Sequence, residues 1–521
     1  MKIIIADNRW IYLDGITPDI SDLLYEHFSA EDPNSKYIDS IQEQSWDGVY
    51  RKYNKREQKL SKAYLNEVIK FCGKYDLPVE IEDRRPPSKY PMYKPEDIKP
   101  DLLAGITLMD HQIEGMLACT KPENEIGIMF YITGAGKSEL MCGIAKLLNC
   151  PTIIMAEETI VVDQLKRRLE LRDVAKEVGV FYAGQSPTGQ LICVGSLASL
   201  LAPPKLGGRK EEETKEDYEK RIKAYKTRSK NHTIYRKLLG KCELLMVDEA
   251  DKAASNKQYK KVIQKYTKSR YIYGFTGTLP MEEDKLDNLN LTELLGGVIA
   301  KSDRRYLESI GRIIPVKYIT TVFGNNNRND KSAFDIAVKE LIEQNEELHL
   351  KIKQIIDAFP NDNFLVLVEN IELGKALEEK IPGSAFIFGT TARNTRNDAL
   401  KKFEKKTLRV LIGSKILKRG LDLNGGVDNL ILCASSKKDS DLEQKVGRAV
   451  RINNRGWARV FDFMFINNFY LYRHSRRRLA RMLQLGYPTM VVTPKKTYDG
   501  KEVMKKGFNL FRPCNFPPRQ L

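Results

Sequence analysis

Short apolar runs alternate with stretches of helical periodicity through most of the 521-residue chain. A first series of apolar runs lies at residues 126–132, 153–155, 191–194, 244–247 and 271–275. From about residue 312 a second series follows, at residues 316–320, 364–368, 385–388, 410–412, 430–432 and 460–463. Nearly continuous apolar strands separated by helices are typical of parallel sheets that are covered on both faces. The pattern predicts an α/β fold with two tandem parallel-sheet domains, at residues 105–310 and 311–467.

The first 90 residues have a smaller pattern of their own. Short apolar runs at residues 3–6 and 10–13 predict strands, and apolar positions recur at helical spacing in residues 20–28 and 63–75. These elements predict a small α+β N-terminal domain over residues 1–90. Five prolines between residues 86 and 100 interrupt the next stretch, so residues 91–104 are predicted to be a linker.

Two segments stand out by their charge. Residues 203–237 are densely charged and include the run Arg209-Lys210-Glu211-Glu212-Glu213, which predicts an insertion, helical or flexible, that projects from the first sheet. The chain after Asn467 is rich in arginine, and residues 468–521 are predicted to form a short basic C-terminal extension. We expect the arginines at 476–478 to contact nucleic acid.

Composition narrows the class of protein. Lys and Arg exceed Asp and Glu by a formal net charge of +17, which favours a polyanionic partner such as nucleic acid but also fits a basic enzyme without one. The eight cysteines include no C-x-x-C pair and the five histidines are dispersed, so neither a disulfide framework nor a zinc site is expected. No apolar run approaches a membrane span, and the N-terminal run is too short for a signal peptide. We expect a cytoplasmic protein with no membrane partner, in the host cytoplasm if a phage encodes it.

A phosphate-binding loop is indicated directly after the first apolar strand. The loop and the start of the following helix contain Thr133, Gly134, Ala135, Gly136, Lys137 and Ser138. The glycines let backbone N–H groups turn toward an anion, and the helix start adds the positive end of its dipole. Lys137 supplies a charge for the β- and γ-phosphates of a nucleotide, and the Ser138 hydroxyl suits Mg²⁺. The strict pattern of such loops has glycine where this chain has Tyr131.

An acidic tetrad, Asp248-Glu249-Ala250-Asp251, follows the apolar run at residues 244–247. Open α/β sheets bind their ligands at the carboxyl ends of their strands. Asp248 can hold Mg²⁺ through water, and Glu249 can polarise an attacking water as general base. A charged turn after a strand is common by itself. Its place on a later strand of the sheet that carries the phosphate loop favours a catalytic role.

Together these motifs resemble superfamily 2 helicases and translocases, in which Asp-Glu-Ala-Asp is the DEAD-box string. The resemblance implies RecA-like domains, ATP and Mg²⁺ as cofactors, and a role for each matching segment. Gln112, in Leu-Met-Asp-His-Gln, resembles the residue that reads adenine. Ser196, in Val-Gly-Ser, resembles a residue that contacts the nucleic acid strand, and Thr278, in Gly-Phe-Thr-Gly-Thr, resembles one that couples hydrolysis to nucleic acid.

The second predicted domain carries the other motifs of the resemblance. Ser414, in Ile-Gly-Ser, implies a contact with the tracked strand, and Asp422, in Gly-Leu-Asp, implies a contact with the nucleotide. Residues 444–451 match Q-x-x-G-R-x-x-R in full. Its two arginines share one face of a helix and can reach the γ-phosphate as arginine fingers. The predicted catalytic residues, at a site between the two domains, are Lys137, Asp248, Glu249, Arg448 and Arg451.

One motif departs from the family and one segment narrows the resemblance. Motif Ia usually has Pro-Thr, but here Glu157 and Glu158 precede Thr159. Because carboxylates repel phosphate, the strand contact is either lost at this site or passes to Thr159. Ser-Trp-Asp-Gly at residues 45–48, placed before such a motor, resembles the phage UvsW-type recombination helicases, a family that unwinds, anneals and branch-migrates DNA.

The N-terminal domain also offers a candidate nucleic-acid surface. Lysines and arginines between residues 52 and 62 lie beside aromatic residues, a combination that suits stacking on an unpaired base and neutralising phosphates. We expect Trp46 and Arg56 to contact DNA at a branch point. The alternatives are a solvated charged face, or a domain that braces the motor with Trp46 in its core.

The sequence thus predicts an ATP-dependent DNA helicase that remodels forks and junctions in replication, recombination and repair. Its expected partner is branched, single-stranded or duplex DNA, with RNA–DNA hybrids left open and no protein partner indicated. One alternative is an RNA helicase of the DEAD-box type, favoured by the tetrad but not by Q-x-x-G-R-x-x-R and Thr-Gly-Thr. Another is a duplex translocase subunit of a nuclease or remodelling complex. A non-catalytic binder is disfavoured by Lys137, Glu249 and the paired arginines.

Overall fold

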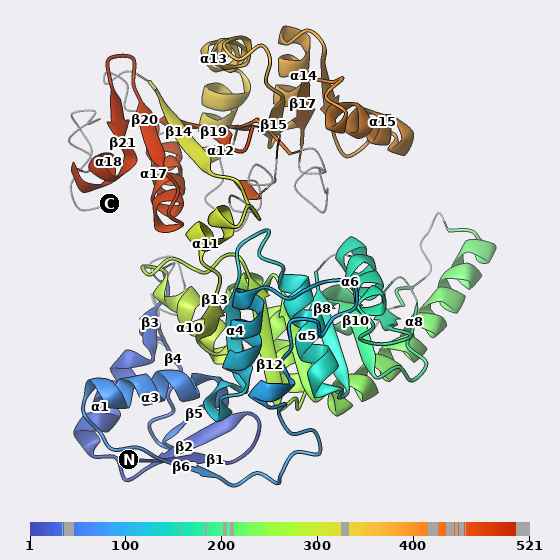
Figure 1. The fold of residues 1–521 in the computed structure, drawn as a ribbon, viewed down its shortest axis with the longest axis vertical. Helices are drawn as coiled ribbons and strands as arrows, with labels where there is room; N and C mark the ends of the chain where they lie inside the picture. The colour runs from blue at the N-terminus through green and yellow to red at the C-terminus, as the bar shows by residue number, and fades with distance from the viewer. Residues whose placement is uncertain are drawn as a thin grey trace. The chain divides into compact units, whose positions relative to one another are not determined.

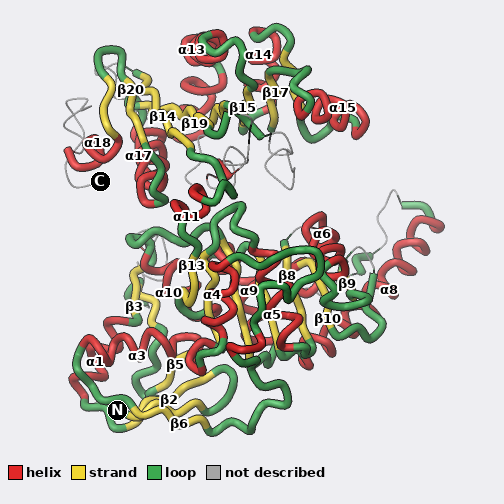
Figure 2. The backbone as a smooth tube through the Cα atoms, in the orientation of Figure 1, coloured by secondary structure: helices red, strands yellow, loops and turns green. Residues whose placement is uncertain are grey.

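The computed structural model describes residues 1–506 except 34, 36–45, 158, 183–184, 202–205, 209–212, 325–332, 415–425, 434–441, 443–445, 448–452 and 454. The chain divides into two compact units (Figure 1). The first comprises Met1–Ile132 and Gly136–Ser302, and the second Thr133–Ala135 and Asp303–Leu521. Each unit contains one large, predominantly parallel sheet with helices on its faces, and the first also contains a small α+β region. The predicted fold class is therefore confirmed (Figure 2).

The N-terminal α+β region is built on a four-stranded sheet of order β5-β2-β1-β6. Its strands are β1 (Lys2–Ile5), β2 (Trp10–Asp14), β5 (Lys59–Ser61) and β6 (Glu80–Asp83), and a separate hairpin joins β3 (Ser29–Glu31) and β4 (Val49–Arg51). The helices α1 (Pro18–His27) and α3 (Leu65–Lys74) complete the region. In α3, Leu65, Val68 and Cys72 recur at helical spacing and are buried. They form a core with Ile3 and Leu13 of the sheet.

The large sheet of the first unit is parallel throughout, with strand order β13-β7-β12-β11-β8-β10-β9. Its strands are β7 (Ile126–Phe130), β8 (Thr152–Ala156), β9 (Gly179–Phe181), β10 (Ile192–Ser196), β11 (Leu244–Asp248), β12 (Tyr271–Thr276) and β13 (Val298–Lys301). Its α-helices are α4 (Asp110–Cys119), α5 (Lys137–Leu148), α6 (Thr159–Leu171), α7 (Leu197–Leu201), α8 (Lys215–Lys241), α9 (Lys257–Lys260) and α10 (Lys285–Leu295). The order brings β7, β12 and β11 side by side. The segments after these strands, which carry the predicted motifs, therefore leave the same edge of the sheet.

The second unit is built on a sheet of order β16-β17-β15-β18-β19-β14-β20-β21. Its strands are β14 (Val316–Phe323), β15 (Phe364–Val368), β16 (Ser384–Ile387), β17 (Val410–Gly413), β18 (Asn429–Cys433), β19 (Ala458–Phe465), β20 (Thr489–Val492) and β21 (Thr497–Asp499). The described α-helices are α11 (Arg304–Ser309), α12 (Phe334–Val338), α13 (Glu346–Asp357), α14 (Ile371–Lys380), α15 (Arg393–Glu404), α17 (Phe469–Gln484) and α18 (Gly500–Lys506). Among the described strands of this sheet, only the terminal strand β21 pairs antiparallel.

The segment after Asn467 is integrated into the second unit, which corrects the predicted extension as far as residue 506. Strand β20 pairs in parallel with β14, and β21 adds to β20. In helix α17, Arg478 is 3 % exposed and forms an ion pair with the buried Asp462, Nε to Oδ2 at 2.8 Å. The expectation that the arginines at 476–478 contact nucleic acid is therefore wrong for Arg478, whose side chain is buried in this ion pair. Residues 507–521 lie outside the described part of the chain.

The proline-rich segment at 86–100 packs against the helices and strands of the first unit. Tyr93 is buried, and its hydroxyl donates to the carbonyl oxygen of Met116 in α4 at 2.9 Å. Tyr271, at the start of β12, donates its hydroxyl to the Tyr90 carbonyl oxygen at 3.0 Å. The N-terminal region and the first parallel sheet thus form one compact unit. The exact boundaries assigned from the sequence stay predictions.

The charged insertion is helical where it is described. Helix α8 runs for 27 residues and begins at Lys215, with the Thr214 hydroxyl as its N-cap. It extends away from the sheet beyond the edge formed by β9 and β10 (Figure 1). This confirms the helical form of the prediction over residues 215–237.

Candidate nucleotide site and nucleic-acid contacts

The phosphate-binding loop has the backbone that its glycines predict. Gly134 and Gly136 have φ angles of 91° and 80°, in the left-handed region that favours glycine. Gly136 is the N-cap of α5, so the helix opens directly from the loop. A Cβ atom on Gly136 would overlap the side-chain amide of Gln112. The amide nitrogen of Gln112 in fact donates to the Gly136 carbonyl oxygen at 3.2 Å. The predicted adenine reader and the phosphate loop are thus in contact.

Tyr131 explains how the loop tolerates the departure from the strict motif. Its side chain is fully buried, and its hydroxyl donates to the carbonyl oxygen of His111 in α4. The ring therefore anchors the end of β7 to α4. Lys137, the first residue of α5, reaches back to the Tyr131 carbonyl oxygen with Nζ at 3.3 Å. Its ammonium group thus lies at the carboxyl end of β7, where the charge of a nucleotide phosphate would be met.

The acidic tetrad lies at the carboxyl end of β11. Burial raises the pKa of Asp248, the neighbouring Glu249 raises it further, and Lys137 opposes both effects. A divalent cation would relieve this repulsion, and the Asp248 carboxylate and Ser138 hydroxyl are oxygen ligands of the kind that Mg²⁺ prefers. The donor set therefore fits the ion. Glu249 has a φ angle of 49°, a strained conformation that recurs at functional sites.

A hydrogen-bond network links the tetrad to the Thr-Gly-Thr segment after β12. The Thr276 hydroxyl oxygen lies 2.8 Å from Asp251 Oδ1 and 2.8 Å from the Thr278 carbonyl oxygen, and its single proton can serve only one of them. It also accepts the Thr278 backbone N–H at 3.0 Å. The loops that follow β11 and β12 are therefore held together by a side chain that sequence reasoning did not single out.

The altered motif Ia also has a structural partner. Glu157, after β8, forms an ion pair with Lys252, the residue that follows the tetrad. The ion pair with Glu157 raises the pKa of Lys252, although burial alone would lower it. Instead of repelling phosphate, the Glu157 carboxylate thus ties the loop after β8 to the catalytic loop. Thr159, the predicted strand contact, is exposed at the start of α6, and Glu158 lies outside the described residues.

Three other predicted nucleic-acid contacts are buried in this structure. The Ser196 hydroxyl lies 2.8 Å from the Ser199 hydroxyl in the first turn of α7. Thr278 is held by the network around Thr276. Ser414 follows β17, and its backbone N–H donates to the Ile387 carbonyl oxygen at 3.0 Å. Their roles toward nucleic acid stay predictions.

The lysines of the basic strip predicted for the N-terminal region largely form internal ion pairs. The strip is therefore not the free nucleic-acid surface that the sequence predicted. Lys52 Nζ lies 2.6 Å from Glu293 of α10, with both side chains mostly buried. Lys62 is 3 % exposed and pairs with Glu125, ahead of β7. Tyr53, one of the aromatic residues beside this strip, is part of the hydrophobic core. The strip therefore attaches the region to the first sheet.

Trp46 and Arg56 differ in their surroundings. Trp46 is half-buried, packs edge-on against Tyr50 with ring centroids 5.0 Å apart, and donates its indole N–H to the Val49 carbonyl oxygen at 3.3 Å. Arg56 is exposed in the turn before β5. The structure does not bring these two residues together with the nucleotide site. Their contact with DNA stays a prediction.

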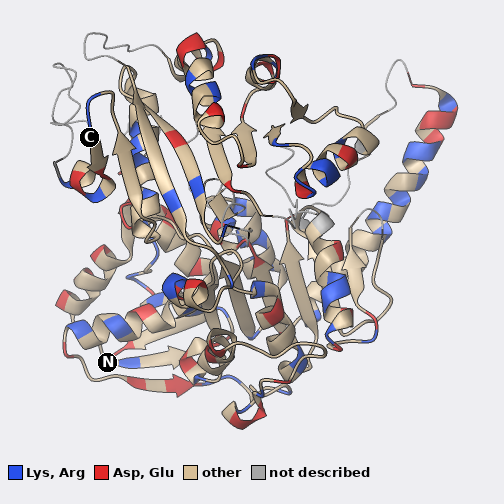
Figure 3. Cartoon of the chain, turned by 45° about the horizontal axis from the view of Figure 1, so that its top comes forward, with Lys and Arg blue, Asp and Glu red and all other residues tan. Residues whose placement is uncertain are grey.

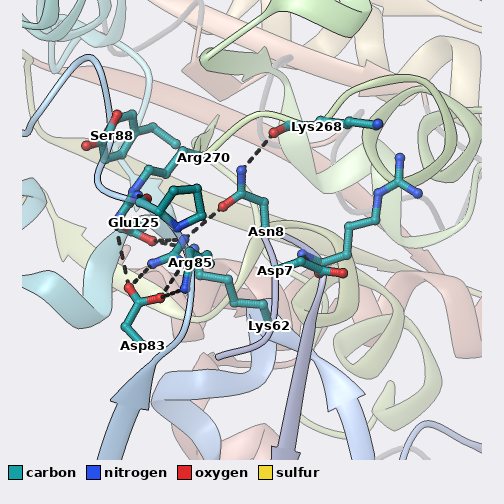
Figure 4. Close-up of polar contacts among 12 residues, drawn as sticks. Asp7, Asn8, Lys62, Asp83, Arg85, Ser88, Glu125, Lys268 and Arg270 are labelled. Atoms are coloured by element: carbon teal, nitrogen blue, oxygen red, sulfur yellow. Dashed lines mark hydrogen bonds and ion pairs between the residues drawn. The ribbon is translucent and has the colours of Figure 1, made fainter. Parts of the chain in front are cut away.

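A buried charged cluster joins the N-terminal region to the starts of two motor strands (Figure 4). Glu125, directly before β7, accepts from Lys62, from Arg85 at 2.8 Å and from Arg270 at 2.7 Å. Arg270 directly precedes β12. Burial lowers the pKa of Lys62 to about 8, against the opposing effect of Glu125. No sequence signal indicated this cluster, because its members lie up to 208 positions apart in charged stretches of ordinary appearance.

The remaining predicted nucleotide contacts, Asp422, Arg448 and Arg451, lie outside the described residues. Within the part of the chain that is described, no helix is long and apolar enough to cross a membrane. In the same part, no group of three or more His, Cys, Asp or Glu side chains is arranged to hold a metal ion. The seven described cysteines are all buried free thiols.

Two family models match successive parts of this chain. The model described as the res subunit of type III restriction enzymes matches residues 105–281, and the model described as the helicase conserved C-terminal domain matches residues 349–453. The first covers the phosphate loop, the acidic tetrad and the Thr-Gly-Thr segment. The two matches identify superfamily 2 helicase domains in this chain, the domains of a class of ATP-hydrolysing enzymes that act on nucleic acids.

Several solved structures are similar in fold. UvsW of bacteriophage T4 is 14 % identical, with 94 % of this chain and 99 % of that chain covered and a TM-score of 0.43. A fragment of a putative HsdR subunit of a type I restriction enzyme from Vibrio vulnificus YJ016 is 13 % identical, with 82 % and 74 % covered and a TM-score of 0.51. Dbp5 of S. cerevisiae, bound to RNA and ADP BeF3, is 14 % identical, with 77 % and 93 % covered and a TM-score of 0.44. No curated protein matches the chain.

Proposed function

We propose that this helicase uses ATP and Mg²⁺ to move along DNA and to unwind and remodel branched DNA. The observation that carries the motor function is the placement of three motifs on the adjacent strands β7, β12 and β11, with the Thr276–Asp251 hydrogen bond joining the last two. Through this bond the acidic loop after β11, which is proposed to act on the nucleotide, contacts the Thr-Gly-Thr segment after β12, which is proposed to couple hydrolysis to nucleic acid. DNA is favoured over RNA by Q-x-x-G-R-x-x-R and Thr-Gly-Thr, which differ from the DEAD-box spelling.

Each residue predicted to bind or hydrolyse the nucleotide then has a chemical task. The N–H groups of the loop and the Lys137 ammonium bind phosphate oxygens, and Ser138 and Asp248 would hold Mg²⁺. Glu249 orients and deprotonates the attacking water. Bound Mg²⁺ supplies charge neutralisation at the phosphates. Arg448 and Arg451 are proposed to stabilise the charge that develops on the γ-phosphate, as arginine fingers do.

The test is an ATPase panel on single-stranded DNA, duplex DNA, forks, four-way junctions and matched RNA, with strand displacement measured on the forks. We expect DNA to stimulate turnover and RNA to have little effect. Lys137→Ala should reduce turnover to background, because no other cation of the loop replaces its charge. Lys146→Ala is the matched control, since Lys146 lies in the last turn of the same helix with its Nζ 3.7 Å from Asp173.

Two results would contradict this proposal. Stimulation by RNA equal to that by DNA would favour an RNA helicase, the alternative that the tetrad spelling suggests. Turnover on duplex DNA without strand displacement on any fork would favour a translocase that acts through a partner.

A further inference from the structure

Part of the positive charge of this protein is paired with carboxylates inside the structure, where a polyanion cannot reach it. Lys52 and Lys62 are paired with carboxylates inside the first unit, and Arg478 is buried against Asp462 in the second. The two basic surfaces expected from the sequence therefore supply less free charge than their composition suggests. Helix α8 has a different character. Between residues 220 and 241 it contains nine lysines and arginines and no aspartate or glutamate.

The lysines of α8 are arranged along one face. At 100° per residue, five of them fall within a sector of about 60°, and all five are exposed. We call this set the α8 stripe: Lys223, Lys226, Lys230, Lys237 and Lys241. Figure 3 shows the blue of basic residues along this helix, with acidic residues gathered near its N-terminal end.

The opposite face of the helix fixes which way the stripe points. Asn231, Tyr235 and Leu239 are buried there. The Tyr235 ring packs edge-on against Phe181 of β9 with centroids 4.8 Å apart, and its hydroxyl donates to the Gln185 carbonyl oxygen. These contacts hold the C-terminal half of α8 on the sheet. The stripe consequently faces solvent as a preformed row of charge.

Local carboxylates do not neutralise the stripe. Two of the acidic groups near the start of α8 pair with other cations, Glu213 with Arg221 at 2.7 Å and Asp217 with Lys220 at 3.6 Å. In the described part of the chain, no stripe lysine forms an ion pair with a carboxylate. This contrasts with the N-terminal strip, where the local carboxylates have taken the charge.

We infer that the α8 stripe binds the phosphate backbone of duplex DNA beside the motor, an inference that rests on the proposed DNA-dependent function. A rise of 1.5 Å per residue places its ends about 27 Å apart. Since a DNA strand rises about 3.4 Å per nucleotide, this length corresponds to roughly eight base pairs. Lysine binds phosphate as a flexible point charge and reads no base, so the contact is independent of sequence.

Duplex is favoured over single-stranded DNA by what the stripe lacks. Sites for unpaired strands usually combine cations with aromatic side chains on which bases stack. The stripe contains no aromatic residue. A helix with lysines along one face presents its charge in a fixed row, as a duplex presents its phosphates, whereas a flexible single strand would have to be ordered along it.

The experiment compares salt-dependent binding by two matched quadruple variants of the full chain. One replaces Lys223, Lys226, Lys230 and Lys237 with glutamine. The control replaces four exposed lysines elsewhere in the first unit, Lys74, Lys89, Lys99 and Lys121. Both remove the same charge, and glutamine is as good a helix former as lysine. Affinity for a duplex of arbitrary sequence is measured between about 50 and 200 mM salt, with circular dichroism and ATPase without DNA as checks on folding.

We expect the slope of log K against log salt to fall by about 0.9 for each stripe lysine that contacts a phosphate. For four lysines this is about three to four units, and the control should change the slope little. A larger effect on duplex than on single strands is also expected. Equal slopes for the wild type and the stripe variant would overturn the inference, as would equal losses in stripe and control. A wild type that binds no DNA would instead overturn the proposed function. The inference alone fails when the wild type binds DNA with a steep slope and the stripe variant keeps that slope or loses no more of it than the control.

Discussion

At the scale of single residues, the catalytic loop is shaped by contacts that cross between strands. Glu249 holds a left-handed backbone with φ of 49°, which costs about 1–3 kcal/mol in a residue other than glycine. Its neighbours compensate for this cost: Ala250 is fully buried, and Asp251 is bonded to Thr276. The backbone around Glu249 is therefore held by the rest of the tetrad and by the strand next to it.

Glu249→Gln should bind ATP but hydrolyse it about 10²–10⁴ times more slowly, because the amide cannot accept the proton of the attacking water. Nucleotide affinity, measured with a fluorescent ATP analogue, should stay near that of the wild type. Glu243→Gln is the control, since Glu243 precedes the same strand at its opposite end. Near-normal turnover in Glu249→Gln would mean that another group is the base.

At the scale of elements, the sequence predicted the strands that are buried on both faces, because burial requires an apolar run. The central strands β8, β11, β12 and β15 are buried along almost their whole length, so their composition identified them. Strands β9 and β13 were missed because β9 has only three residues and β13 has no fully buried position. Strand β20 alternates between buried and exposed positions within a basic segment, where charge suggested an extension.

The site was predictable to a similar extent. Each motif that is contiguous in the sequence was found, because glycine, lysine and paired carboxylates have few other uses at the end of a buried strand. The pairs Thr276–Asp251 and Glu157–Lys252 were not found. Their members are 25 and 95 residues apart, and only the strand order brings them together. Likewise, no periodicity reveals that one arginine of α17 is buried against an acid on β19.

Arg478→Ala should lower the free energy of unfolding of the second unit by about 3–5 kcal/mol, because it leaves the buried Asp462 carboxylate without its cationic partner. Arg473→Ala, at an exposed position of the same helix, should change it by less than about 0.5 kcal/mol. Urea unfolding followed by fluorescence measures both. If the two variants are equally stable, the ion pair does not contribute as its burial implies.

At the scale of the whole molecule, the N-terminal region is attached to the first parallel sheet at the edge opposite the one that carries the catalytic loops. Glu125 and Arg270 directly precede β7 and β12, and the opposite ends of these strands carry the phosphate loop and Thr276. Lys62 and Arg85 reach this pair of strands from the N-terminal region. A second attachment joins Lys52 to α10 through Glu293. Both are charged contacts with little exposure, which are costly to leave half-made.

Deleting residues 1–90 should therefore impair the motor on every DNA substrate alike. The deletion removes Lys62 and Arg85 from Glu125 and exposes the part of the first sheet that they cover. We expect a lower unfolding temperature and a similar fractional loss of ATPase on single strands, duplexes and forks. Lys62→Met should show the same pattern more mildly, whereas Lys70→Met, at an exposed position of α3, should not. A truncated protein that keeps its stability and its activity on single strands, and loses only its preference for forks, would show that the region reads branches and does not brace the motor.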